Sequence, residues 1–227
     1  MSSEVRRRGA FILFEGADRC GKSTQCTKLV EYLTQKGLPV RKIGFPDRSS
    51  PTTGALLDAY LQGRTPVDAH VSHLMFSANR WEKAAEMKEL LHSGHTVIVD
   101  RYAYSGIAYS VAKKSIPFAW ACQADVGLPA PDVILYFSLN FDDMQRRPGF
   151  GDEIFDNREF QTTVQDIYSQ MRKADPSPET WRVIEANRAV DEIHQEIVSI
   201  ANDVITKVAG KPLAELQAPI GVHKELI

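Results

Sequence analysis

The chain has 227 residues, a formal net charge of −2 and 25% charged side chains. This length suits one α/β domain, and so weak a net charge gives no reason to expect a nucleic-acid partner or attraction to a membrane surface. Three cysteines without paired spacing, and no apolar run near the ~20 residues of a membrane span, predict a reduced, cytoplasmic setting and small-molecule partners.

Short apolar runs predict five strands along the chain. They lie at Phe11–Phe14, Val40–Phe45, Thr96–Val99, Val133–Leu139 and Val183–Ile184, and longer segments with helical periodicity separate them. Strands that alternate with helices form βαβ units, which build a parallel sheet covered by helices on both faces. We therefore predict one α/β domain over residues 9–208.

Three segments fall outside this pattern. Residues 1–8 contain three arginines but no apolar signal core, so we expect a flexible tail and leave a nuclear or organellar location open. Residues 146–157 mix glycine, proline and charge, which predicts a mobile flap. Residues 209–227 carry two prolines and little periodicity, which predicts a C-terminal extension that packs on the surface or is disordered.

The first predicted strand leads into a segment that fits the phosphate-loop pattern G-x-x-x-x-G-K-[ST]. Glycines let backbone N–H groups converge on phosphate oxygens, Lys22 can reach the β and γ phosphates, and Ser23 can offer a hydroxyl to Mg²⁺. A plain glycine turn that opens a helix is the alternative. We assign ATP binding to Gly16, Ala17, Asp18, Arg19, Cys20, Gly21, Lys22, Ser23 and Thr24.

Polar residues follow two further predicted strands. Asp100 closes the apolar run from residue 95, where P-loop enzymes hold an acid near Mg²⁺, and Arg101 comes next. Arg48 stands shortly after the strand that ends at Phe45. Because ligands of open α/β sheets bind at the carboxyl ends of strands and a guanidinium suits a phosphate, both arginines are candidates for holding an acceptor phosphate. A surface position is the alternative for each.

A helix is predicted over Asp68–Leu91. Phe76 and Arg80 lie one turn apart, where an aromatic ring and a guanidinium together could bind a flat ring. A second packed layer or a dimer contact would explain the same pair, so the residues leave this choice open. At about 100° per residue, the opposite stripe, expected to face the core, contains Val71, Leu74, Met75, Ala78, Trp81 and Ala85.

Together these motifs resemble the thymidylate kinase family, in order and spacing, over about residues 9–208. The resemblance implies a P-loop nucleoside monophosphate kinase fold with a five-stranded parallel sheet flanked by helices on both faces. It also implies transfer of the γ-phosphate of ATP to dTMP, giving ADP and dTDP for dTTP biosynthesis, with Mg²⁺ and a homodimer. The motifs are the phosphate loop, Phe45-Pro46-Asp47-Arg48-Ser49, Phe76-Ser77-Ala78-Asn79-Arg80-Trp81, Asp100-Arg101-Tyr102-Ala103-Tyr104-Ser105-Gly106 and Asp125-Val126-Gly127-Leu128-Pro129-x-Pro131-Asp132.

The resemblance also assigns residues to the substrates. Phe76 would stack on thymine and Arg80 would hydrogen-bond it, while Arg48 and Arg101 would clamp the dTMP phosphate. Tyr109 would stand close to where a 2′-hydroxyl would project. The implied dTMP site comprises Asp18, Phe45, Arg48, Phe76, Arg80, Arg101, Ser105, Gly106, Tyr109, Gln123 and Phe155.

The donor side follows in the same way. Ser23 and Asp100 would serve Mg²⁺, and Arg147 and Arg188 would border the ATP base. The chain departs from the family pattern at two positions. Phe155 stands where a tyrosine is expected, and Cys20 occupies a loop position that is more often small and inert.

Arg19 distinguishes the type of enzyme that the resemblance implies. Thymidylate kinases of the eukaryotic type carry the catalytic arginine in the phosphate loop, whereas the common bacterial type carries basic residues in the flap. We predict a catalytic set of Asp18, Arg19, Lys22 and Arg101, in which Arg19 bridges donor and acceptor phosphates.

Two other functions compete with this assignment. A broader pyrimidine deoxynucleotide kinase would also accept dUMP. A P-loop switch protein would bind nucleotide without an acceptor, but the chain lacks the Asn-Lys-x-Asp motif of guanine-binding switches and has acceptor-side arginines instead.

Overall fold

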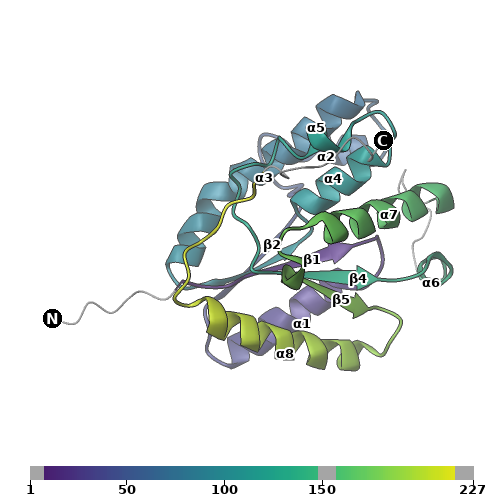
Figure 1. Cartoon of the computed structure of the whole chain (residues 1–227). Coiled ribbons are helices and arrows are strands. Elements are labelled where there is room, and N and C mark those ends of the chain that lie inside the picture. Colours follow the sequence, from purple (N-terminus) through teal and green to yellow (C-terminus); the bar gives the residue numbers. More distant parts are fainter. Residues whose placement is uncertain (1–7, 148–156, 218–227) are drawn as a thin grey trace.

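The computed structural model describes residues 8–147 and 157–217 (Figure 1). A short 3-10 turn, η1 (Pro178–Thr180), precedes the last strand. The other elements are, in chain order, β1 (Phe11–Gly16), α1 (Lys22–Gln35), β2 (Val40–Gly44), α2 (Gly54–Leu61), α3 (Ala69–His92), β3 (Thr96–Asp100), α4 (Ala103–Val111), α5 (Phe118–Ala121), β4 (Val133–Ser138), α6 (Phe141–Gln145), α7 (Arg158–Ala174), β5 (Trp181–Glu185) and α8 (Val190–Val208).

The strands form a five-stranded sheet in the order β2-β3-β1-β4-β5, with every neighbouring pair parallel. Every residue of the central strand β1 is buried, whereas the edge strands β2 and β5 are partly exposed. The predicted fold class is confirmed, and each predicted strand overlaps an observed one. Because the strands are parallel, the loop after β1 and the end of β3 meet at one edge of the sheet.

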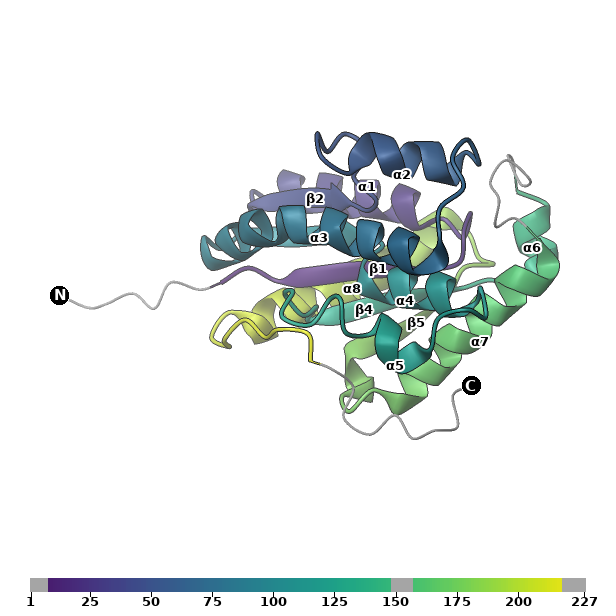
Figure 2. The same ribbon diagram turned by 90° about the horizontal axis from the view of Figure 1, so that it is seen from above.

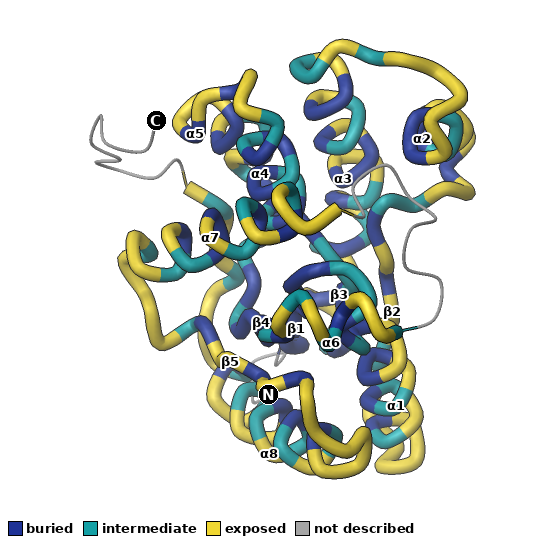
Figure 3. Tube along the Cα trace, turned by 90° about the vertical axis from the view of Figure 1, so that its right-hand side faces the viewer, coloured by how far each residue is buried: buried dark blue, intermediate teal, exposed yellow. Residues whose placement is uncertain are grey.

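Helices cover both faces of the sheet. Figure 3 shows α1 and α8 on one side and α3, α4 and α7 on the other. In Figure 2, α3, α4 and α7 lie next to one another in that order, with α2 beside α3. Alternate residues of β1 supply the two cores: Phe11 and Leu13 pack toward α3, α4 and α7, and Ile12 and Phe14 pack toward α1 and α8.

The α3 helix forms where it was predicted, but its predicted core face was wrong. Val71, Leu74 and Trp81 are exposed, at 49%, 49% and 42%. The buried face is instead mainly polar at its N-terminal end and apolar at its C-terminal end, and comprises Ser72, His73, Ser77, Asn79, Arg80, Ala84, Met87 and Leu91. The physical reason is that these buried polar side chains have hydrogen-bond partners elsewhere in the chain: His73 pairs with Ser110, Asn79 with Thr53 and Arg80 with Asp125. Apolarity therefore did not mark the side facing inward.

The N-terminal end differs from the prediction at its inner limit, whereas the described part of the C-terminal extension packs on the domain, which is one of the two predicted alternatives. Arg8, expected to end a flexible tail, is buried and donates to Asp132, with an Nη2–Oδ1 distance of 2.7 Å. Residues 211–217 of the predicted extension pack on the domain, through Leu213 and Leu216. Residues 1–7 and 218–227, and most of the predicted flap, lie outside the described residues. Within the described ranges, no helix has the length and apolarity needed to cross a bilayer.

Candidate active site

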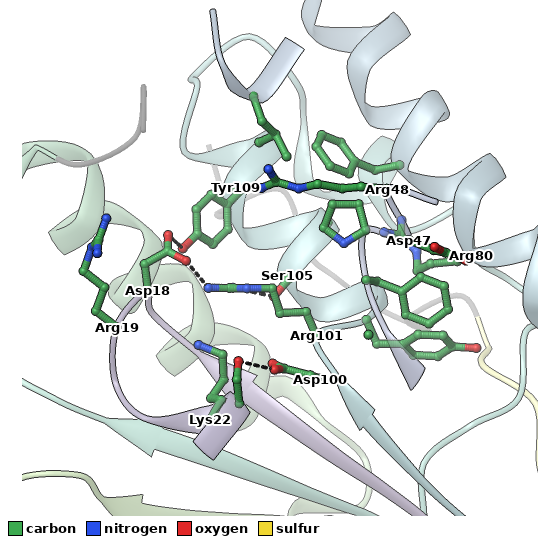
Figure 4. A pocket seen from close by; sticks show the side chains of 18 of the residues that line it. Asp18, Arg19, Lys22, Asp47, Arg48, Arg80, Asp100, Arg101, Ser105 and Tyr109 are labelled. Carbon is green, nitrogen blue, oxygen red and sulfur yellow. Dashed lines mark hydrogen bonds and ion pairs between the residues drawn. The ribbon is translucent and has the colours of Figure 1, made fainter. Parts of the chain in front are cut away.

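A cavity of about 750 Å³ opens at the carboxyl ends of β1, β2 and β3. The loop between β1 and α1 forms one wall, α3 and α4 form the other, and the segment after β2 lies between them (Figure 4). The residues that line it include Asp18, Arg19, Gly21, Lys22, Ser23, Thr24, Phe45, Arg48, Phe76, Arg80, Asp100, Arg101, Ser105, Gly106, Tyr109 and Arg147. The cavity therefore brings together most of the residues predicted for both substrates.

The loop after β1 has the backbone geometry of a phosphate loop. Gly16 has φ +132°, and a Cβ there would lie 2.6 Å from the carbonyl oxygen of Phe137, so no other residue fits without movement. Gly21 has φ +94° and is the N-cap of α1. The Lys22 ammonium donates to the Ala17 carbonyl at 2.5 Å, which places it inside the loop. Backbone N–H groups at the start of α1 and this ammonium are suited to phosphate.

Ser23 and Asp100 meet on the floor of the cavity. The Ser23 hydroxyl donates to Oδ2 of Asp100 at 2.5 Å. A hydroxyl and a carboxylate are hard oxygen ligands of the kind that Mg²⁺ takes beside nucleotide phosphates. The residues predicted for the metal thus fit it chemically.

Asp18 connects the phosphate loop to α4. Its carboxylate accepts from Arg101 and, at 2.6 Å, from the Tyr109 hydroxyl. Burial alone would raise the pKa of Asp18, but Arg101 and Lys22 outweigh it and lower the pKa below its ordinary value. Asp18 is therefore ionised in the neutral pH range. Gln161 of α7, for which no role was predicted, also hydrogen-bonds Asp18.

The backbone of Arg101 is held in an unusual conformation. Its φ of +66° is rare for a residue with a side chain. Glu15, at the end of β1, accepts hydrogen bonds from the N–H groups of Tyr102 (2.9 Å) and Ser105 (3.1 Å), which fixes the chain just after Arg101. The same carboxylate accepts from the Tyr168 hydroxyl of α7 at 2.7 Å. Glu15 was missed in the sequence, although an acid inside a buried central strand is itself a signal, because it needs such partners.

Arg80 belongs to α3 and lies on the wall of the cavity opposite the phosphate loop. It is 3% exposed and forms a two-pronged ion pair with the buried Asp125, through Nε–Oδ1 at 3.0 Å and Nη2–Oδ2 at 2.7 Å. Ser77 donates to the same carboxylate at 2.8 Å. Phe76 lies one residue before Ser77 and lines the cavity, with its ring 6.1 Å from that of Tyr60. No role was predicted for Asp125 from its motif, and its partner in the structure is Arg80.

Substituting Gly106 with alanine is expected to displace Arg80. A Cβ at Gly106 would lie 2.7 Å from Nη2 of Arg80, and Asp125 holds that guanidinium in place. We expect the KM for the ligand that Arg80 contacts to rise ~10-fold. Gly44→Ala is the matched control, because Gly44 lines the same cavity and a Cβ there meets nothing within 4 Å. Equal KM changes in both variants would contradict this interpretation.

Arg48 lies on the segment between β2 and α2. It lines the cavity and donates to Asp58 of α2 at 3.1 Å. The turn that carries it is fixed by α3, since Asn79 accepts from the N–H of Asp47 at 2.7 Å and donates to its carbonyl at 3.0 Å. Phe45 precedes this turn and lines the cavity as well.

The two residues predicted to border the ATP base, Arg147 and Arg188, lie near the loop that follows β5. Arg147 donates to the carbonyl oxygens of Arg19 (2.7 Å) and Ala186 (2.9 Å), and so joins the phosphate loop to the loop after β5. Arg188 lies on that second loop and pairs with Glu196, outside the lining of the cavity.

The prediction for Gln123 differs from the structure. Gln123 is exposed, and its Nε2 donates to the carbonyl of Ala119 at 3.4 Å, away from the cavity. It sits on the turn that follows α5, whose buried side chains include Asp125. Phe155 lies outside the described residues.

A phosphate loop on a central parallel strand, an acid at the end of the neighbouring strand and arginines across one shared cavity define a P-loop nucleoside monophosphate kinase. A family model for thymidylate kinase matches residues 14–197. The chain therefore belongs to the thymidylate kinase family, as its motifs predicted.

Individual proteins support the same assignment. The chain is 42% identical to thymidylate kinase of Homo sapiens, over 92% of this chain and 98% of that protein. It is also 42% identical to thymidylate kinase of Dictyostelium discoideum, with 93% of each chain covered. The solved structure of thymidylate kinase from Candida albicans matches with a TM-score of 0.82 and 31% identity, over 92% of this chain and 99% of that one.

Proposed function

We propose that this chain transfers the γ-phosphate of ATP to dTMP, giving ADP and dTDP, through the residues of the cavity described above. The observation that carries the proposal is the pair between Asp18 and Arg101, which joins the phosphate loop directly to the acceptor side. A switch protein binds one nucleotide and needs no arginines on the opposite wall of the cavity to hold an acceptor phosphate.

The donor phosphates would bind on the phosphate loop. Its N–H groups and Lys22 would contact the β and γ phosphates, and Ser23 and Asp100 would hold Mg²⁺. When bound, Mg²⁺ supplies positive charge that neutralises the phosphate oxygens. Arg147 would border the ATP base, because it bridges the phosphate loop and the loop after β5.

The acceptor would bind across the cavity. Arg48 and Arg101 would hold the dTMP phosphate, Phe76 would stack on thymine, and Arg80 would hydrogen-bond the base edge. Tyr109, fixed by Asp18, would stand beside the sugar. The phosphate of dTMP is itself the nucleophile, so the protein's main tasks are to align the two substrates and offset their negative charges.

Arg19 would act between the two substrates. Its φ of +59° keeps it in the left-handed region, and Figure 4 shows Asp18 between Arg19 and Arg101. From there its guanidinium would bridge the donor and acceptor phosphates as charge develops on the transferred group.

The proposal is tested by ADP release from ATP and Mg²⁺ with dTMP, dUMP, dCMP and thymidine offered separately. We expect dTMP to give the fastest release. The Candida albicans protein is described as having a broad substrate specificity, so turnover of dUMP at a comparable rate would favour the broader alternative. No acceleration by any acceptor would contradict the kinase proposal.

The exposed face of α3 carries large apolar side chains, and we propose that this face forms the interface of a homodimer. Val71, Leu74 and Trp81 leave large apolar groups on one helix face, and such patches are typical of protein interfaces. We predict a dimeric mass for the wild-type chain and a monomeric mass for Val71→Asp/Leu74→Asp. Leu56→Asp on α2 is the matched control, because Leu56 is 58% exposed on another element. A monomeric wild-type chain would overturn the dimer.

A cytoplasmic location stays a prediction that localisation of the tagged chain would test.

A further inference from the structure

The chain after α8 forms a strap, residues 211–217, that pairs with residues 127–130. Figure 1 shows the chain after α8 passing from the layer of α1 and α8 to the layer that holds α3. The pairing is antiparallel: Gly127 donates to the Leu216 carbonyl at 2.9 Å, Leu216 donates to the Leu128 carbonyl at 2.8 Å, and Ala130 donates to the Ala214 carbonyl at 2.9 Å.

Further contacts anchor the strap at both ends. Arg8 donates from Nε to the Lys211 carbonyl at 2.8 Å, and its guanidinium is itself held by Asp132. Lys88 of α3 pairs with Glu215 at 2.7 Å. Leu213 and Leu216 pack against the core to which α3 and α4 contribute. The strap is thus tied to the domain along its length.

The segment that the strap covers carries the partner of Arg80. Residues 124–130 are not part of a helix or strand, so their position depends on what holds them from each side. On the α3 side, the Trp81 indole and the Ser77 hydroxyl both donate to the Ala124 carbonyl, at 2.8 and 2.9 Å. The strap holds the same segment from residue 127 onward, through its hydrogen bonds to Gly127 and Leu128. Asp125 lies in the chain between Ala124 and Gly127, and it fixes Arg80.

We infer that the strap is a positioning element for the acceptor site: it holds the backbone that carries Asp125, and Asp125 holds Arg80 at the base. This rests on the proposed function, in which Arg80 contacts the base of dTMP. The phosphate loop, Ser23 and Asp100 make no contact with the strap among the hydrogen bonds and ion pairs described above. Loss of the strap should therefore affect the acceptor and spare the donor.

The test compares the full chain with two truncations, one ending after Gly210 and one ending after Gln217. Without the strap, we expect the KM for dTMP to rise ~10-fold, while the KM for ATP and the kcat change less than about twofold. The longer truncation keeps the strap and should match the full chain. If the shorter truncation fails to fold, Leu216→Pro takes its place in the test, because it removes the N–H that binds the Leu128 carbonyl. We expect this variant also to raise the KM for dTMP.

A merely structural strap would give a different pattern. It would lower the melting temperature and the active fraction, leaving both KM values unchanged in the molecules that remain folded. That outcome, or an equal rise in both KM values, would overturn the inference. Failure of the full chain to release ADP in response to dTMP would instead overturn the proposed function, so the two failures are told apart by the full chain alone.

Discussion

Arg19→Gly is expected to lower kcat by ~10³ or more, the scale of an arginine that stabilises charge in phosphoryl transfer. The KM for dTMP should stay nearly unchanged, because the acceptor clamp is assigned to Arg48 and Arg101. Glycine tolerates the φ of +59° at this position and keeps the carbonyl that accepts from Arg147. The substitution therefore removes the guanidinium while leaving the loop backbone in place.

Arg19→Lys is the matched control for charge. Lysine keeps the positive charge but lacks the planar fork that can contact two phosphate groups at once, so we expect a rate between those of the glycine variant and the wild type. Steady-state kinetics with saturating ATP and varied dTMP separate the two parameters. An equal loss of kcat and dTMP affinity in Arg19→Gly would contradict a role confined to the transition state.

Arg101→Gln is expected to damage both activity and stability. The acceptor phosphate loses one arm of its clamp, so kcat/KM for dTMP should fall ~10²-fold or more. The Asp18 carboxylate also loses its ion-pair partner. Since the side chains of Arg101 and Asp18 are only 18% and 23% exposed, we expect the free energy of unfolding to fall by ~2 kcal/mol, below the range for fully buried pairs.

The double variant Asp18→Asn/Arg101→Gln separates these two losses. Neutralising Asp18 removes the unpaired charge, so urea unfolding should show recovered stability while activity stays low. If the double variant is no more stable than Arg101→Gln, the ion pair does not account for the stability loss.

The pH dependence of the same pair follows from the lowered pKa of Asp18. A carboxyl group whose pKa is lower in the folded state stabilises the fold at any pH above its pKa in the unfolded chain, here 3.8. This contribution is lost as the pH falls through the pKa of the folded state. The stability difference between wild type and Arg101→Gln should therefore be full at pH 7 and shrink below about pH 4. A difference that stays constant over this range would contradict the assignment.

The sequence predicted the parts of the site that depend on local pattern. The phosphate loop is a continuous motif, and Asp100 and Arg101 follow an apolar run, so parallel topology alone brings them to the same edge of the sheet. The arrangement of α3 could not be predicted in this way. Its inward face is polar because Arg80 and Asn79 have partners elsewhere in the chain, and its apolar stripe is the exposed one.

Residues that act through distant partners were also out of reach. Glu15 accepts a hydrogen bond from Tyr102 at the start of α4, 87 positions further along the chain. Asp125 holds Arg80, which lies 45 positions earlier. The strap at residues 211–217 has too little periodicity to reveal its antiparallel pairing. Gln123 was placed in the cavity by resemblance, but the turn after α5 carries its side chain outward. Tertiary contacts decide each of these positions. The acid at Glu15, inside a buried strand, signals that it needs partners but does not say which residues they are.

The fate of the terminal phosphate of ATP tests the central claim most directly. The protein would be incubated with Mg²⁺, dTMP and ATP labelled at the γ-phosphate, and the products separated. We predict that the label appears in dTDP at the rate at which ADP forms. Label found only in inorganic phosphate, at a rate that dTMP does not change, would contradict phosphoryl transfer to dTMP.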